Sequence, residues 1–126
     1  MGTAVEHYKQ GLAHFSHQKH EEAAAEFLKA LEQKPDWLDA MHALATAQSK
    51  LGKQDEALAT IARVIELDPD DPFAYTSQSI FLQRKGLVPE AEAASAKARM
   101  AAWKKELKTN PNAPPPTAAG GMSIVQ

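Results

Sequence analysis

Cysteine is absent from this chain of 126 residues, and aromatic residues are sparse, with two tryptophans, two tyrosines and four phenylalanines. Without cysteine there is no disulfide framework and no thiol that could serve as a nucleophile or a metal ligand. The sequence also lacks a glycine-rich phosphate loop and any arrangement that matches a known catalytic triad. These absences argue against an enzyme and against a bound cofactor.

Long apolar runs are missing as well. No stretch approaches the roughly 18 consecutive apolar residues of a membrane-spanning helix, and the N-terminus lacks the basic-then-apolar pattern of a secretory signal. The lack of cysteine fits a reducing compartment. We therefore expect a cytoplasmic protein with no membrane span.

The charges are unevenly distributed along the chain. Residues 1–71 contain 7 Lys/Arg and 13 Asp/Glu, whereas residues 72–126 contain 7 Lys/Arg and 3 Asp/Glu. The net charge of the whole chain is only −2. Either the two halves have different solvated faces, or they guide head-to-tail self-association or contact with a partner. We expect no nucleic-acid binding, because only Trp103 offers a stacking ring near the basic residues of the second half. These basic residues are Lys97, Arg99, Lys104, Lys105 and Lys108.

A dipeptide that recurs every 34 residues is the main pattern that is present. It occurs as Glu22-Ala23, Glu56-Ala57 and Glu90-Ala91. Other positions keep the same interval, namely Pro35 with Pro69, Gly52 with Gly86, Phe27 with Ile61, and Ala30 with Val64 and Ala98. A period of this length, carried by small and apolar residues, is typical of a stacked repeat protein.

The spacing of apolar residues predicts six helices, over about 4–17, 20–34, 37–50, 54–67, 72–85 and 89–108. Pro35 ends the second helix, and Asp36 is expected to cap the third. Asp70 or Asp71 is expected to cap the fifth, with Pro72 in its first turn. The sixth is longer than the others because Trp103 stands where the period predicts a third proline, so we expect this helix to cap the last repeat.

The composition changes after the sixth helix. A triple proline at 114–116 and a glycine pair at 120–121 indicate a linker. We expect the apolar residues Ile124 and Val125 beyond it to dock elsewhere. The sequence thus predicts a repeat domain over 4–108 and a Pro/Gly-rich tail over 109–126.

The repeated residues resemble those of the tetratricopeptide repeat (TPR) family over about 4–105, in three repeats at 4–37, 38–71 and 72–105. The second helices carry the better match, with Ala23, Phe27, Ala30 and Pro35, then Ala57, Ile61, Val64 and Pro69, then Ala91, Ser95, Ala98 and Trp103. The first helices match less well, with His7, Gln10, Gly11 and His14, then Met41, Leu44, Ala45 and Gln48, then Tyr75, Gln78, Ser79 and Leu82. The resemblance implies an all-α, right-handed solenoid of three antiparallel helix-turn-helix hairpins with an extended C-terminal capping helix.

The resemblance also implies a concave groove, lined by the first helix of each repeat, that holds a partner peptide. The matching residues are Val5, Tyr8, Leu12 and Phe15, then Asp39, His42, Thr46 and Lys50, then Phe73, Thr76, Ser77, Ile80 and Arg84. One branch of the family grips acidic chaperone tails with a clamp of lysines, asparagines and an arginine. The matching positions here are Tyr8, Leu12, Ala43, Phe73 and Ser77, which carry none of these residues. An apolar or aromatic ligand is therefore favoured; the alternative for Tyr8, Leu12 and Phe15 is ordinary packing between helices.

Five histidines raise the question of a metal site, with His14, His17 and His20 three residues apart. A helix places the first two on neighbouring faces, and His20 lies past the expected turn, so we expect no metal. His42 projects toward the expected groove, where its ring is a hydrogen-bond donor for a ligand.

The prediction for function is a non-enzymatic interaction scaffold or adaptor, a small subunit of a larger assembly that binds a protein or peptide partner. The alternative is a secretion or assembly chaperone that holds a client transiently in the same groove. Self-association, through the tail or the oppositely charged ends, stays open.

Overall fold

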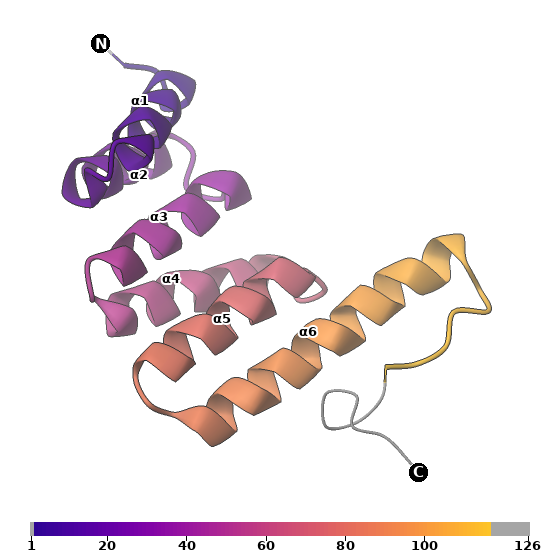
Figure 1. Cartoon of the computed structure of the whole chain (residues 1–126). Helices are drawn as coiled ribbons and strands as arrows, with labels where there is room; N and C mark the ends of the chain where they lie inside the picture. Colours follow the sequence, from indigo (N-terminus) through magenta and orange to yellow (C-terminus); the bar gives the residue numbers. More distant parts are fainter. Residues whose placement is uncertain (1, 117–126) are drawn as a thin grey trace. The chain divides into compact units, whose positions relative to one another are not determined.

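The computed structural model describes residues 2–116, and all regular structure in that range is helical (Figure 1). The helices are α1 (Ala4–Ser16), α2 (His20–Gln33), α3 (Leu38–Lys50), α4 (Gln54–Leu67), α5 (Pro72–Arg84) and α6 (Val88–Thr109). Each begins and ends within one residue of its predicted bounds. The predicted all-α fold is confirmed.

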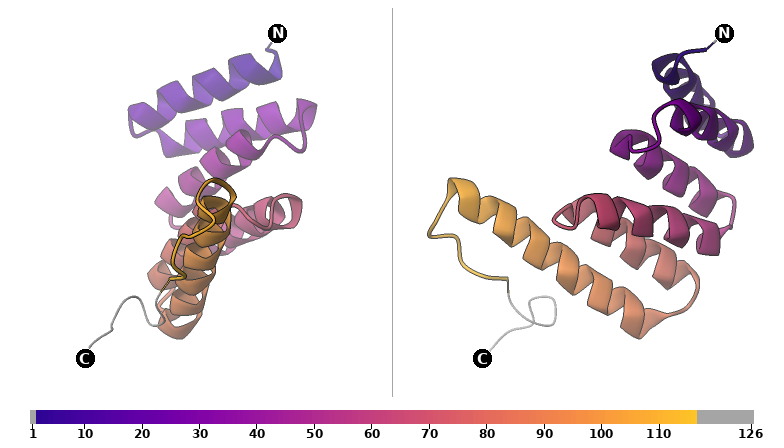
Figure 2. Two further views of the ribbon diagram at one scale, coloured as in Figure 1. Left: turned by 90° about the vertical axis from the view of Figure 1, so that its right-hand side faces the viewer. Right: turned by 180° about the vertical axis from the view of Figure 1, so that it is seen from behind.

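The chain forms two compact units, Met1–Leu67 with α1 to α4, and Asp68–Gln126 with α5 and α6. In the first unit α1 packs on α2, α2 on α3 and α3 on α4; in the second, α5 packs on α6 (Figure 2). The division into a repeat domain over 4–108 and a tail over 109–126 stays a prediction. Ile124 and Val125, the expected docking residues of the tail, lie outside the described residues.

Two helix starts, 68 residues apart, are capped by side chains. At α1, the Glu6 amide donates to Thr3 Oγ1 at 3.1 Å and the Thr3 amide donates to Glu6 Oε1 at 2.9 Å, a reciprocal capping box. At α5, Asp71 Oδ1 accepts from the Phe73 amide at 2.9 Å, ahead of Pro72 in the first turn. The predicted cap of α5 is confirmed at Asp71.

The start of α3 differs, and the predicted cap at Asp36 is wrong. The capping position is Trp37, 34 residues after Thr3, and it makes no capping bond with its side chain. The Asp36 carboxylate instead lies 3.4 Å from the Arg63 guanidinium of α4. Asp36 stands one position too early, because the backbone enters the helix only after the extended Trp37 (φ −79°, ψ 103°).

The turn inside each hairpin needs one residue with a left-handed backbone, again at the 34-residue interval. Gly52 and Gly86 hold this position in the second and third hairpins, with φ of 81° and 82°. Gln18 holds it in the first, with φ of 64°. A residue with a Cβ atom is strained there, whereas glycine is not.

The core of the first unit is small and tightly packed. Ala23, Phe27, Leu44 and Ala47 form a buried cluster. Phe27 is fully buried, and a Cβ atom on Gly11 of α1 would lie 2.6 Å from its Cδ1 atom. The absence of a side chain at position 11 therefore allows α1 to approach α2 closely.

The second unit is held together by alanines and a pair of serines. Ala74, Phe81, Ala91, Ala94 and Ala101 are its buried apolar residues within the helices. The hydroxyl of Ser79, 5% exposed, lies 2.8 Å from the carbonyl oxygen of Ala91 and 3.0 Å from the hydroxyl of Ser95. These contacts link α5 to α6 through side-chain hydrogen bonds.

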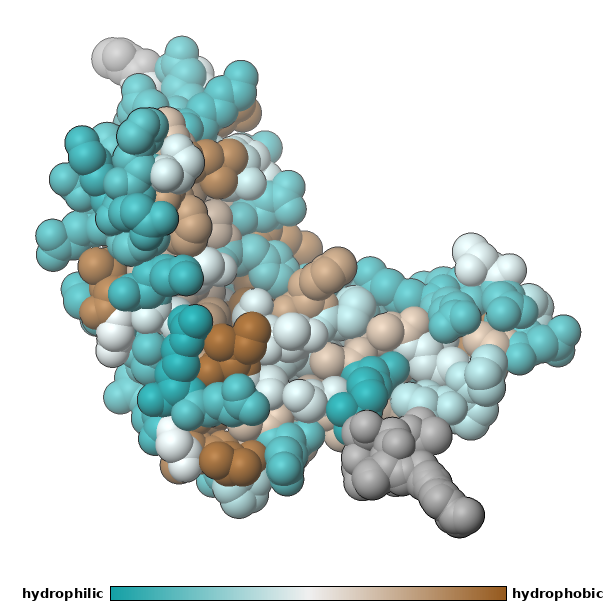
Figure 3. All heavy atoms as spheres, in the orientation of Figure 1, coloured by the Kyte–Doolittle hydropathy of each residue, from teal (hydrophilic) through white to brown (hydrophobic). Residues whose placement is uncertain are grey.

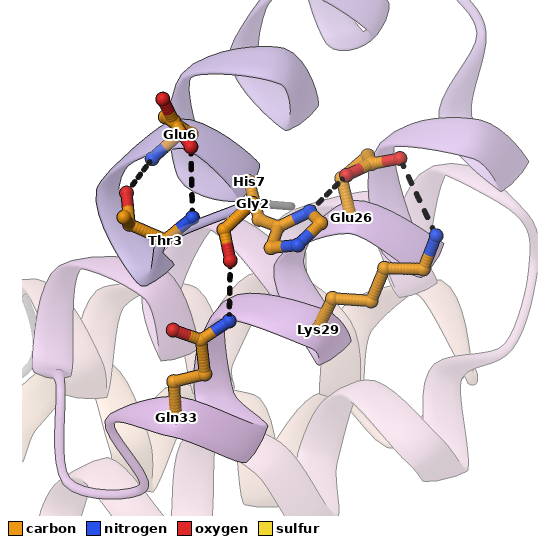
Figure 4. A network of polar contacts seen from close by, with 7 residues as sticks. All are labelled: Gly2, Thr3, Glu6, His7, Glu26, Lys29 and Gln33. Carbon is orange, nitrogen blue, oxygen red and sulfur yellow. Dashed lines mark hydrogen bonds and ion pairs between the residues drawn. The ribbon is translucent and has the colours of Figure 1, made fainter.

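A polar network fixes the beginning of the chain to α2 (Figure 4). The Gln33 side chain donates to the Gly2 carbonyl at 2.8 Å, and His7 Nδ1 lies 2.7 Å from Glu26 Oε1. Lys29 lies 3.8 Å from the other oxygen of Glu26. The hydrogen bond from His7 is the main reason that the pKa of Glu26 falls below its ordinary value of 4.5; Lys29 adds a smaller effect in the same direction.

Candidate functional site

An apolar hollow lies between α1 and α3 of the first unit. Its volume is about 200 Å³, and its lining residues are Leu12 and Phe15 of α1, Phe27 of α2, and Ala43 and Thr46 of α3. Phe27 is completely buried beneath it, while Leu12 remains 43% exposed. On the face that Figure 3 shows, apolar residues emerge between hydrophilic ones and form no continuous patch. The small volume and apolar lining of the hollow suit one apolar side chain of a ligand.

The one polar side chain in this lining already uses its hydroxyl proton. The Thr46 hydroxyl donates to the carbonyl oxygen of His42 at 3.0 Å. Such a bond turns the oxygen of the hydroxyl toward the helix backbone. No lysine, arginine or carboxylate lines the hollow, so its chemistry is that of apolar burial.

An aromatic cluster adjoins the hollow one turn earlier on α1. The Tyr8 ring lies 5.9 Å from that of Phe27 and 4.7 Å from that of Trp37, measured between ring centroids. The Lys34 ammonium lies 4.6 Å from the centroid of the Trp37 ring, within the range of a cation–π contact. Trp37 therefore joins the start of α3 to α1.

Asp39 gives this end of the site a negative charge. Burial, and in second place the charge of Asp39, raise the pKa of the Tyr8 phenol above its ordinary value of 10.0. Tyr8 is therefore neutral near pH 7, with its hydroxyl proton in place. A second hollow, of about 570 Å³, follows the loop and helix start at 34–39. The site thus combines an apolar hollow with an aromatic end that carries Lys34 as well as Asp36 and Asp39.

Within the first unit, the structure brings several residues of the predicted groove together. Leu12, Phe15 and Thr46 share one hollow, with Val5 exposed on α1 and Asp39 and Lys50 exposed on α3. Tyr8 and Phe15 also pack against the buried cluster, so the packing interpretation applies to both. Phe73, Thr76, Ile80 and Arg84 belong to α5 in the second unit, where Phe73 is 74% exposed. The groove assignment stays a prediction.

Trp37 was missed as a site residue, although the sequence held a signal. The 34-residue interval aligns it with Thr3 and Asp71, two residues that cap helices. An aromatic residue at a capping position gives up a helix-stabilising bond, which indicates another role. Here that role is contact with Tyr8 and Lys34.

Three of the five histidines have ring contacts, although the buried Nδ1 atom of His20 has no hydrogen-bond partner among the described residues. His7 pairs with Glu26, His17 Nδ1 lies 2.9 Å from the Ala13 carbonyl oxygen, and His20 meets the Phe15 ring edge to face at 4.8 Å. Within residues 2–116 no group of three or more histidine, aspartate or glutamate side chains is placed to bind a metal. Over the same range no helix is both long and apolar enough to cross a membrane.

A sequence model of one known family, described as "Tetratricopeptide repeat", matches residues 14–77, which is more than half of the chain. The chain belongs to the tetratricopeptide repeat family. The resemblance found in the sequence is thereby confirmed, and the pairs α1/α2, α3/α4 and α5/α6 are its helical hairpins. No curated protein sequence matches the chain as a whole or in part.

Solved TPR structures share the fold. A crystal structure of MamA superimposes with a TM-score of 0.78 at 26% identity, covering 82% of this chain and 61% of MamA. The first TPR of Spaghetti (RPAP3), bound to the HSP90 peptide SRMEEVD, superimposes with a TM-score of 0.71 at 19% identity, covering 87% of this chain and 81% of that structure. The Sgt2 TPR domain from Aspergillus fumigatus superimposes with a TM-score of 0.67 at 15% identity, covering 95% of this chain and 90% of that domain. This chain thus spans about three fifths of the length of MamA.

Proposed function

We propose that this TPR protein is a non-enzymatic scaffold whose α1–α3 face binds an extended segment of a partner protein, as part of a larger assembly in the cytoplasm. TPR proteins are in general protein–protein interaction modules. The observation that carries the proposal is the hollow of about 200 Å³ between Leu12 and Phe15 on one side and Ala43 and Thr46 on the other. In this proposal, one apolar side chain of the partner fills the hollow.

The charges around the hollow favour a partner segment that is apolar or basic. Asp39 lies close enough to raise the pKa of Tyr8, Lys34 lies over the Trp37 ring, and residues 1–67 carry 7 Lys/Arg against 10 Asp/Glu. RPAP3 binds a peptide, SRMEEVD, with three carboxylate side chains and one arginine. The hollow described here offers no cation to such a peptide, so we propose a different ligand class.

The test compares two leucines on neighbouring helices. Peptides are first selected from a random displayed library against the full chain. Leu12→Glu is then expected to weaken their binding by roughly 10- to 100-fold, the equivalent of losing about 1.5–3 kcal/mol of apolar burial. Leu28→Glu, at a leucine of α2 that is 50% exposed and outside the hollow, is the matched control. Equal effects of the two variants on binding, with unchanged helical circular dichroism, would refute the site.

The chaperone alternative uses the same hollow and differs from the scaffold in the lifetime of the complex with the bound protein. A scaffold keeps its partner, so the complex dissociates slowly, whereas a chaperone releases its client. Once a partner is known, its dissociation rate separates the two. Light scattering over a dilution series tests the further possibility of self-association, which predicts a mass that rises with concentration.

A further inference from the structure

The chain reverses direction after α6. This helix has 22 residues, whereas its partner α5 has 13. Beyond its end the Asn112 amide donates to Asn110 Oδ1 at 3.2 Å and the Ala113 amide donates to the Asn110 carbonyl at 3.0 Å. The turn directs residues 111–116 back along α6, as Figures 1 and 2 show.

The returning segment is held by Trp103. The indole nitrogen of Trp103 donates to the carbonyl oxygen of Ala113 at 3.0 Å. Ala113 is only 6% exposed, and Trp103 and Leu107, one turn apart on α6, are half-buried. The contact is therefore a packed one with a directed hydrogen bond.

The chemistry of the two partners is complementary. Ala113, Pro114 and Pro115 each precede a proline, which confines them to extended backbone, and the prolines themselves have a fixed φ. Such a segment forms no internal hydrogen bonds and, where proline replaces other residues, offers carbonyl oxygens without amide donors. An indole N–H donates and never accepts, and its ring supplies an apolar face. Aromatic surfaces of this kind recognise polyproline segments in general.

We infer that the Trp103 side of α6 is a recognition site for extended proline-rich segments, and that residues 111–116 occupy it as a tethered ligand. The inference is independent of the α1–α3 hollow. The short tether gives the internal segment an effective concentration in the millimolar range, so an external segment competes only at about that concentration. A proline-rich partner held nearby, by any second contact, would displace the internal segment.

The experiment uses the full chain labelled with ¹⁵N. Because the chain has two tryptophans, its spectrum contains two indole N–H signals, and Trp103→Phe assigns them. The triple variant Pro114→Gly, Pro115→Gly, Pro116→Gly removes the extended bias and is expected to shift the Trp103 signal toward that of a solvent-exposed indole. Peptide with the sequence of residues 110–116 is then added. It is expected to return the Trp103 signal of the variant to its position in the unmodified chain. The peptide concentration needed for this should be several-fold lower than the concentration that perturbs the unmodified chain. The Trp37 signal is the internal control.

Three results would overturn the inference. The first is a Trp103 signal that is the same in the unmodified chain and the triple variant. The second is a signal that shifts in the variant but is not restored by peptide at about 10 mM, well above the effective concentration of the tether, which would make the segment a structural strap only. The third is equal restoration by a peptide with glycine in place of its three final prolines.

Discussion

A Cβ atom on Gly11 would lie 2.6 Å from Cδ1 of Phe27, closer than non-bonded carbon atoms approach. Phe27 is fully buried, so its ring cannot move aside without disturbing the cluster around it. Overpacking of this kind costs about 1–3 kcal/mol, whereas alanine gains about 1 kcal/mol over glycine inside a helix.

We therefore expect Gly11→Ala to lower the free energy of unfolding by up to about 2 kcal/mol, as measured by urea denaturation. Gln10→Ala, at an exposed position of the same helix, is the control and should change it by less than about 0.5 kcal/mol. A Gly11→Ala protein as stable as the parent would show that α1 can shift away from α2 at no cost.

Replacing Gln18 is expected to have the opposite effect. Its φ of 64° is the left-handed conformation that Gly52 and Gly86 adopt at the same place in the other hairpins. Gln18→Gly should raise the free energy of unfolding by up to about 1 kcal/mol, because glycine bears no penalty there. Gly52→Ala should lower the free energy of unfolding by a similar amount. Urea denaturation of the two variants should therefore give shifts of opposite sign. A loss of stability on Gln18→Gly would contradict the prediction.

The acidic peptide SRMEEVD, which RPAP3 binds, should not bind this chain. No cation lines the α1–α3 hollow, and at its aromatic end the charge of Asp39 offsets that of Lys34. Isothermal titration with the full chain is expected to give no heat of binding up to about 1 mM peptide, a limit of about −4 kcal/mol. Micromolar affinity would refute the ligand class proposed above.

The pairing of His7 with Glu26 predicts that the stability of the fold depends on pH in the acidic range. Because the pKa of Glu26 is lowered in the folded chain, its charge stabilises the fold above the ordinary value of 4.5, and this contribution is lost as the pH falls through the lowered pKa. Glu26→Gln should therefore reduce stability at about pH 6 and reduce it less at about pH 3, which lies below the ordinary pKa of 4.5. Glu32→Gln, at an exposed glutamate of the same helix, is the control. If Glu26→Gln lowered stability equally at both pH values, the effect would come from the shape of the side chain and not from its charge.

Much of the fold was predictable because its signals are local. Pro35, Gly52 and Gly86 end helices through their own backbone restrictions, and these do not depend on the rest of the molecule. The 34-residue period then placed three similar hairpins without any knowledge of contacts. The mistaken cap at Asp36 shows the limit, because one residue of extended backbone at Trp37 decided which side chain faces the first turn.

The site was less predictable because its contacts join residues that are distant in sequence. The tilted ring contact between Tyr8 and Trp37 joins residues 29 positions apart, and nothing in the local pattern specifies it. The bond from Trp103 to Ala113 was likewise hidden, although the missing proline at position 103 marked the helix as unusual. The period identified Trp103 as exceptional but not what it contacts.

The serine pair between α5 and α6 has a consequence for how that hairpin is aligned. Ala91, Ala94 and Ala101 present small, similar bumps to α5, and a surface of that kind allows one helix to slide along the other. A slide by one turn would carry Ser79 away from Ala91 and Ser95 and leave a buried hydroxyl unpaired, at a cost of about 1–3 kcal/mol. The two hydroxyls thus select one axial register out of several that alanine alone would permit.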